Sequence, residues 1–352
     1  MQRVLLVLLV CVCELSLSLP PDSPLCHNLS RPVLVKFHKV GSETIKDYFL
    51  MMRTDANPYV KWNDGGRCPG LPMDHFVLGV YMMYGNDMNR CIKRSACPNV
   101  APQLVTIVRD PLERYLSALH YFSRPKVTSF VTHYFGKSLN TPLYHTFRKI
   151  LNTPKEATPS DIDQLLRLFM SKPFRNGPHV FYPKFTVQNY EMVLSRQKGL
   201  PYKSTNATAM AAIRNLAKFY AVGYVESMPS LFVLLQKRFP RHLLEDSCFL
   251  HNNHHVNSSR ESPYTAYSAP VVETFKNYLR NEFAVYEAAK DIHRSQLAAE
   301  GYTIESATKK WKDLCATVDP STVPVPAETG FRVKHSYYET PPKKRPSPKI
   351  RP

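Results

Sequence analysis

The amino-acid composition indicates a folded and strongly basic protein. The chain has 352 residues, 43% of them hydrophobic, which is enough for one large domain or two small ones. Lysine and arginine number 46 against 28 acidic residues, and the resulting formal net charge of +18 favours polyanionic partners. A basic surface that merely keeps the protein soluble would have the same composition.

Residues 1–20 are predicted to be a targeting segment. Arg3 precedes a short apolar run from Val4 to Val12, and Glu14 and two prolines follow. The run is short for a membrane span and is typical of a secretory signal peptide, although a short uncleaved anchor would have the same features. We expect a protein of the secretory lumen, where sulfated or carboxylated glycans, rather than nucleic acid, are the polyanions.

Cysteines and glycosylation sequons agree with that compartment. Of the eight cysteines, two lie in the targeting segment and six remain, an even number that is compatible with disulfides. Cys91 and Cys97 could close a small loop, but the sequence leaves the pairing open. Zinc is disfavoured because no paired CxxC spacing occurs. The three sequons begin at Asn28, Asn206 and Asn257.

Strand-like and helix-like segments alternate through the expected folded domain, residues 32–315. It follows a polar lead-in (21–31) and precedes a proline- and lysine-rich tail (316–352) that we expect to be disordered. Strands are predicted at 33–37, 103–109 and 219–226, and helices at 44–52, 110–122, 228–239 and 271–292. This alternation predicts an α/β fold that is P-loop-like, with three layers and a central parallel sheet flanked by helices. Ligands of such sheets bind beyond the carboxyl ends of the strands.

The turn after the first strand, in "VLVKFHKVGSETI", has the residues of an anion site. Lys39 supplies a mobile charge, Gly41 lets the backbone approach a ligand, and Ser42 and Thr44 offer hydroxyls. Main-chain amides at a helix start bind phosphate-like groups. The lysine precedes the glycine, which departs from the Walker pattern and disfavours a kinase that uses ATP and magnesium. An ordinary capped helix start would also have these residues.

The turn after the second strand, in "TIVRDPLERYLSALHYF", adds a second set of ligands. Arg109 ends the strand, and Ser117 lies eight residues later on the following helix. The planar guanidinium suits a phosphate, and a serine at this spacing can face the same ligand. Alternatively, Arg109 pairs with Asp110 or Glu113. The apolar face of this helix is predicted to comprise Leu112, Tyr115, Leu116 and Leu119.

The two turns together resemble the cofactor loops of sulfotransferases that use 3′-phosphoadenylyl sulfate (PAPS). The similarity is closest to the Golgi heparan sulfate 2-O- and uronyl 2-O-sulfotransferases. Weaker similarity in "FYAVGYVESMPSLFVLLQKRFP", "HHVNSSRESP" and "NEFAVYEAAKDI" extends the resemblance over about residues 33–292. The family pattern R-x-P-x-x-R-x-x-S-x-x-x-Y is matched in full by Arg109, Pro111, Arg114, Ser117 and Tyr121.

The resemblance implies specific roles for these residues. Lys39 would contact the phosphosulfate and stabilise the leaving phosphate. Arg109 and Ser117 would bind the 3′-phosphate, and a later loop with Ser259 and Arg260 would close over the nucleotide. The scheme requires no metal. The turn residues implied to surround the 5′-phosphate are Val40, Gly41, Ser42, Glu43 and Thr44.

Two of these turn residues depart from the family pattern. Val40 stands where the family has threonine, and Glu43 places an acid inside an anion-binding turn. They motivate an alternative hypothesis, a catalytically silent relative that binds glycans.

The resemblance also calls for a base that removes the proton of the acceptor hydroxyl. His75 in "PMDHFVLGV" is the favoured residue, because imidazole has a suitable pKa. His38, His120 and Glu43 are rivals, and His75 could instead be a partly buried strand histidine.

The leading hypothesis is therefore a Golgi-luminal sulfotransferase. It would move sulfate from PAPS to a hydroxyl of an acidic or galactose-containing glycan, with a uronyl 2-O-position favoured. The basic residues that could hold a polyanionic acceptor, or equally form a solvated surface, are Lys36, Arg90, Lys93 and Arg94.

Overall fold

The fold is seen in a computed structural model, which describes residues 32–35, 37, 44–45, 48, 78–80, 103–122, 128–136, 139–171, 174–176, 180–182, 189–195, 204–240, 244–248 and 262–319. Among these residues the strands are β1 (Pro32–Val35), β2 (Leu78–Val80), β3 (Gln103–Val108), β4 (Phe174–Asn176), β5 (Val180–Tyr182) and β6 (Ala221–Tyr224). The helices are α5 (Pro111–Phe122), α6 (Thr128–Phe135), α7 (Pro142–Asn152), α8 (Pro159–Ser171), α9 (Asn189–Ser195), α10 (Asn206–Leu216), α11 (Met228–Arg238), α13 (Pro263–Ala266), α14 (Ala269–Ala299) and α15 (Ile304–Cys315), with 3-10 turns η2 (Pro154–Glu156) and η3 (Val225–Ser227).

The central sheet is parallel, as the alternation of strands and helices predicted. In the described residues it has four strands in the order β2-β1-β3-β6, and every neighbouring pair is parallel. Val105, Ile107 and Val108 of β3 are fully buried. This burial accounts for the nearly continuous apolar run of β3, which only Thr106 interrupts after Gln103, because strands of a parallel sheet are commonly covered on both faces. The predicted α/β class with a parallel sheet is thus confirmed.

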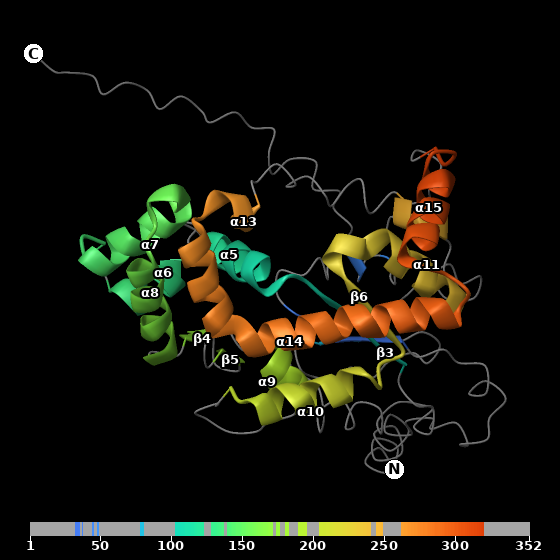
Figure 1. The fold of residues 1–352 in the computed structure, drawn as a ribbon, viewed down its shortest axis with the longest axis horizontal. Helices are drawn as coiled ribbons and strands as arrows, with labels where there is room; N and C mark the ends of the chain where they lie inside the picture. Colours follow the sequence, from blue (N-terminus) through green and yellow to red (C-terminus); the bar gives the residue numbers. More distant parts are fainter. Residues whose placement is uncertain are drawn as a thin grey trace, which may run out of the picture.

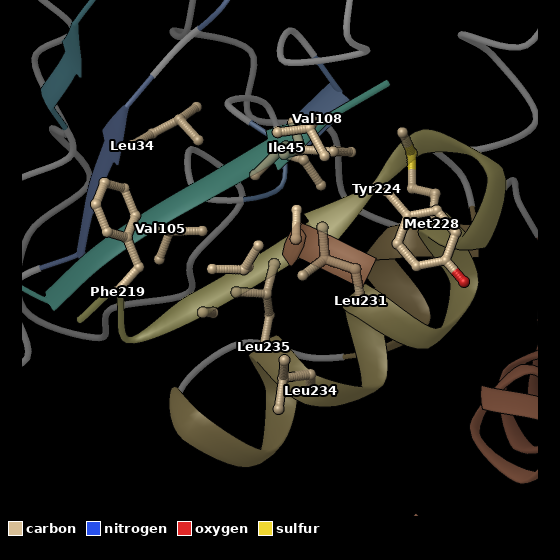
Figure 2. Close-up of a cluster of buried hydrophobic side chains, with 14 of the residues drawn as sticks. Leu34, Ile45, Val105, Val108, Phe219, Tyr224, Met228, Leu231, Leu234 and Leu235 are labelled. Carbon is tan, nitrogen blue, oxygen red and sulfur yellow. The ribbon is translucent and has the colours of Figure 1, made fainter. Parts of the chain in front are cut away.

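One hydrophobic core lies between the sheet and α11. Gly223 of β6 permits a close approach, because an added Cβ would stand 2.8 Å from both Cδ1 and Cγ of the buried Leu231. The strand therefore packs against α11 through its backbone. The side chains labelled in the close-up of this core are Leu34, Ile45, Val105, Val108, Phe219, Tyr224, Met228, Leu231, Leu234 and Leu235 (Figure 2).

The long helix α14 joins this core to a second, helical cluster (Figure 1). Near its start, Phe275 packs into the cluster formed with α5, α6, α7 and α8, whereas Val285, further along, packs into the core of the sheet. The helix exceeds the predicted range 271–292 at both ends. Pro270 lies in its first turn, and Gly301, with φ of 81°, follows its last turn.

Side chains of α14 cover the outer edge of β6, the last strand of the described sheet. The Gln296 amide donates to the Phe219 carbonyl at 2.9 Å and accepts from the Val222 N–H at 2.9 Å. His293 Nδ1 lies 2.7 Å from the Val222 carbonyl, and its Nε2 lies 2.7 Å from the Ser230 hydroxyl. Desolvation lowers the pKa of His293 to about 4, so the ring is neutral. His293 and Gln296 therefore satisfy the edge of β6, and Ser230 holds the His293 ring in place, so this buried serine–histidine contact has a structural role.

A disulfide holds the C-terminal helix α15. Cys315 at its end is bonded to Cys248 in the helical residues 244–248, with the two Cα atoms 5.3 Å apart. Trp311 donates its indole N–H to the Ser247 hydroxyl at 2.7 Å. The sequence had left this pairing open, and the Cys91–Cys97 suggestion lies outside the described residues.

In the described part of the chain, no helix is both long and apolar enough to cross a membrane. Residues 1–20, the predicted targeting segment, lie outside that part.

Candidate functional site

The carboxyl ends of β1, β3 and β6 lie at one edge of the sheet. Val35 of β1 pairs with Thr106 of β3, and Val108 pairs with Tyr224 of β6. The Thr106 hydroxyl also donates to the Val35 carbonyl at 2.8 Å, which ties β1 to β3 near this edge. The chain that leaves β1 and the chain that leaves β3 at Arg109 therefore start from neighbouring strands, where parallel sheets bind ligands.

Three residues of the predicted cofactor site fall within the described part of the chain, namely Thr44, Arg109 and Ser117. The predicted site residues outside it are Lys39, Val40, Gly41, Ser42, Glu43, His75, Ser259 and Arg260. Also outside it are the rival base His38 and the basic residues Lys36, Arg90, Lys93 and Arg94. Of the sequons, Asn206 is exposed at the first position of α10, whereas Asn28 and Asn257 are not described.

Thr44 is helical and buried, with 4% of its surface exposed. Ile45 and Tyr48, which follow it, are fully buried in the core of the sheet. The helix start predicted after the first turn is therefore confirmed at these residues.

Arg109 stands at the end of β3 and is paired with Glu113. Its Nε and Nη2 donate to the same carboxylate oxygen, Glu113 Oε2, at 3.2 and 3.0 Å. This is the local pairing that the sequence offered as the alternative to a phosphate. The two side chains are 29% and 26% exposed, and a partly exposed pair of this kind contributes at most about 1 kcal/mol. An incoming phosphate could therefore compete for the guanidinium.

Ser117 lies on the same face of α5 as Glu113. The predicted apolar face is confirmed, since Leu112, Tyr115, Leu116 and Leu119 are all buried, whereas Glu113, Ser117 and His120 are only partly buried. Residues four apart on a helix are neighbours, so Glu113 is adjacent to Ser117 on α5, and it is also paired with Arg109, which precedes the helix. A carboxylate thus stands beside both predicted ligands of the 3′-phosphate.

Asp110 connects the end of β3 to three other elements. Its Oδ1 accepts from the Glu113 N–H at 3.0 Å, which caps α5, and its own N–H donates to Glu226 Oε1 at 3.1 Å. Its Oδ2 accepts from the Tyr264 hydroxyl at 2.6 Å. Tyr286 makes a further hydrogen bond to Glu226.

The local charge at this edge is unusual for an anion site. Beside Arg109 stand three carboxyl groups, those of Asp110, Glu113 and Glu226. Burial raises the pKa of Asp110 and of Glu226, and hydrogen bonds from their partners oppose that shift. The raised pKa values lessen the negative charge that these two groups carry as the pH falls, and this favours an anion beside Arg109 at lower pH.

Beneath Arg109, a buried polar network joins α5, α9 and α14. Arg114 Nη2 donates to Glu282 Oε2 at 3.1 Å, and the two side chains are 3% and 1% exposed. The same carboxylate accepts the main-chain N–H groups of Tyr190 at 3.3 Å and Glu191 at 3.0 Å, at the start of α9. Burial raises the pKa of Glu282 to about 7, against the attraction of Arg114. Arg114, a residue of the family pattern, is thus part of the interior.

Sequence reasoning missed Tyr190, whose hydroxyl contacts the main chain of Arg109. Nothing in "VQNYEMV" distinguishes this tyrosine from an ordinary core residue. Glu282 carried a weak signal, because "NEFAVYEAAKDI" resembles a family segment and its first glutamate falls on a helix with apolar neighbours.

Comparison of the chain with protein-family models, with curated proteins and with solved structures found no match.

Proposed function

We propose that the protein is a PAPS-dependent sulfotransferase with a P-loop-like three-layer fold, acting on a glycan hydroxyl in the Golgi lumen. The favoured acceptor is a uronyl 2-O-position, with a galactose hydroxyl as the other candidate. The observation that supports this most is the parallel pairing of β1 with β3. It starts the lysine turn and the Arg109 turn from adjacent strand ends, as one nucleotide site would require.

The contact between Tyr264 and Asp110 also supports a single site. Tyr264 follows the predicted nucleotide loop, the segment of Ser259 and Arg260, by four residues. Its hydroxyl donates to Asp110, the residue next to Arg109, at 2.6 Å. The chain therefore reaches the end of β3 shortly after the predicted loop.

Each residue of the proposed site has a definite task in sulfuryl transfer. The acceptor oxygen forms a bond to sulfur while the bond between sulfur and the 5′-phosphate oxygen breaks. Lys39 stabilises the charge that develops on this leaving phosphate. His75 takes the proton of the acceptor hydroxyl, and Arg109 and Ser117 hold the 3′-phosphate so that the reacting groups stay in line.

The acidic surroundings of Arg109 favour a second candidate function. A guanidinium already paired with Glu113, beside Asp110 and Glu226, is suited to a relative that binds glycans elsewhere and has no nucleotide site. The two candidates differ in one measurable property, the affinity for the product nucleotide 3′-phosphoadenosine 5′-phosphate (PAP).

Calorimetric titration of the purified protein with PAP separates the candidates. We expect PAP to bind the wild type and Arg109→Ala to weaken it more than about tenfold, because a charge-assisted pair is lost. Arg167→Ala is the matched control, since Arg167 forms an equivalent i,i+4 pair with Asp163 on α8. Absence of PAP binding by the wild type would favour the silent relative.

Transfer of radiolabelled sulfate from PAPS tests the activity itself. We expect transfer to one member of a panel of desulfated glycosaminoglycans and galactosides, and its loss in Lys39→Ala while that variant stays folded. Undiminished transfer by Lys39→Ala would refute the assigned chemistry.

A further inference from the structure

A single buried hydroxyl bonds both main-chain groups of Arg109. The Arg109 N–H donates to the Tyr190 hydroxyl oxygen at 2.9 Å, and the same hydroxyl donates to the Arg109 carbonyl at 3.0 Å. β3 ends one residue earlier, at Val108, where it pairs with Tyr224 of β6. Tyr190 therefore fixes the peptide groups on both sides of the Arg109 Cα just beyond the end of the strand ladder.

Tyr190 is itself held rigidly. Its ring meets the edge of Phe37 with centroids 4.8 Å apart and planes at 85°, and the Arg114 guanidinium lies 4.2 Å from its centroid. Its main-chain N–H donates to Glu282. The residue is fully buried, and burial raises the pKa of its hydroxyl far above the ordinary value, so the proton that bonds the Arg109 carbonyl is retained.

Two of the residues that Tyr190 contacts, Phe37 and Arg109, belong to the two chain segments that leave neighbouring strands. Phe37 follows the end of β1 by two residues, and Arg109 follows β3 directly. Lys39 comes two residues after Phe37 in the sequence. One side chain thus lies against both segments from which the proposed nucleotide site is built.

We propose that Tyr190 is a positioning residue for the nucleotide: it holds the Arg109 main chain so that the guanidinium is directed at the 3′-phosphate. This inference rests on the proposed function. The Tyr190 hydroxyl acts through Arg109, so it selects for the 3′-phosphate, whereas the contact of the ring with Phe37 does not depend on the hydroxyl. A role in stability alone would not discriminate between nucleotides with and without that phosphate.

Tyr190→Phe is the direct test, since it keeps the ring and both ring contacts and removes the hydroxyl. We expect the affinity for PAP to fall about tenfold, because binding must then order a main chain that the hydroxyl holds in place in the wild type. The affinity for AMP, which lacks the 3′-phosphate, should change less than about twofold. Tyr220→Phe is the control, because the Tyr220 hydroxyl also donates to a main-chain carbonyl, that of Arg238 at 3.2 Å. Its affinities should match those of the wild type.

A double-mutant cycle shows whether Tyr190 acts through Arg109. In the Arg109→Ala background, Tyr190→Phe should have no further effect on PAP affinity. An equal loss in both backgrounds, or an equal loss for PAP and AMP, would overturn the inference.

Hydrogen exchange at the Arg109 amide gives a readout that needs no nucleotide. The amide should exchange faster in Tyr190→Phe than in the wild type, and in the wild type PAP should slow it further. Unchanged exchange in Tyr190→Phe would refute the role of the hydroxyl whatever the function. If exchange accelerates and Arg109→Ala weakens PAP but Tyr190→Phe does not, the inference fails and the proposed function stands. If wild type does not bind PAP, both fail.

Discussion

Removal of Arg114 from the interior should destabilise the protein in a manner that depends strongly on pH. Arg114→Met keeps an apolar side chain of similar length but leaves the Glu282 carboxylate, 1% exposed, without its counter-charge. Breaking a buried pair in this way costs about 3–5 kcal/mol, a large part of a typical total stability of about 5–15 kcal/mol. We expect a loss of this size at pH 8.

The sign of the pH dependence follows from Glu282. Burial raises its pKa to about 7 even though Arg114 acts in the opposite direction. Without Arg114 the pKa of Glu282 rises further. Each further unit adds about 1.4 kcal/mol to the difference in the free energy of unfolding between high and low pH. A raised pKa in the folded state favours folding at low pH, and this stabilisation is lost as the pH rises through the folded-state value. The deficit of Arg114→Met should therefore shrink markedly at pH 5, where the carboxyl group is neutral.

Urea denaturation followed by tryptophan fluorescence, at pH 5 and pH 8, measures the loss of stability and its dependence on pH. Arg114→Met combined with Glu282→Gln should recover most of the stability at pH 8, because both buried charges are then absent. Arg167→Met is the surface control: Arg167 is 72% exposed, and its loss should leave the free energy of unfolding nearly unchanged. A deficit of Arg114→Met that is below about 1 kcal/mol, or equal at the two pH values, would refute the reasoning.

Two further predictions concern the core around β6. His293, whose pKa is lowered to about 4 by desolvation, contributes stability that is present above about pH 6.5 and is lost as the pH falls toward 4. The free energy of unfolding of the wild type minus that of His293→Gln should fall by about 3 kcal/mol over this range, because the opposite effect of Glu282 is common to both proteins. A difference that stays constant with pH in urea titrations would contradict this. Gly223→Ala should cost about 1–3 kcal/mol, because the new methyl group overlaps Leu231. In a Leu231→Ala background the same methyl should be tolerated; an equal cost in thermal denaturation would show that the overlap is not the cause.

Parts of the candidate site could be predicted because their signals are local. The pairing of Arg109 with Glu113 was one of the predicted alternatives, since an arginine at a strand end lies close to the carboxylates at the start of the following helix. The parallel sheet followed from the alternation of strands and helices, and it brings the ends of β1 and β3 together. By contrast, the carboxyl group of Glu226, which bonds the Asp110 N–H, comes from 116 residues away and had no local signal.

By itself, then, the sequence determined the helices and strands whose apolar residues follow a regular pattern over a few residues. The apolar run at 103–108 specified β3, and Asp110 followed by Pro111 and one apolar face specified α5. Only the tertiary structure decided what the polar residues of these elements contact. It paired Arg114 with Glu282 over 168 residues and brought the Tyr190 hydroxyl to Arg109 over 81 residues. The physical reason is that a charged residue on a helix has the same local pattern whether it faces water or a buried partner, and burial depends on which distant elements pack against it.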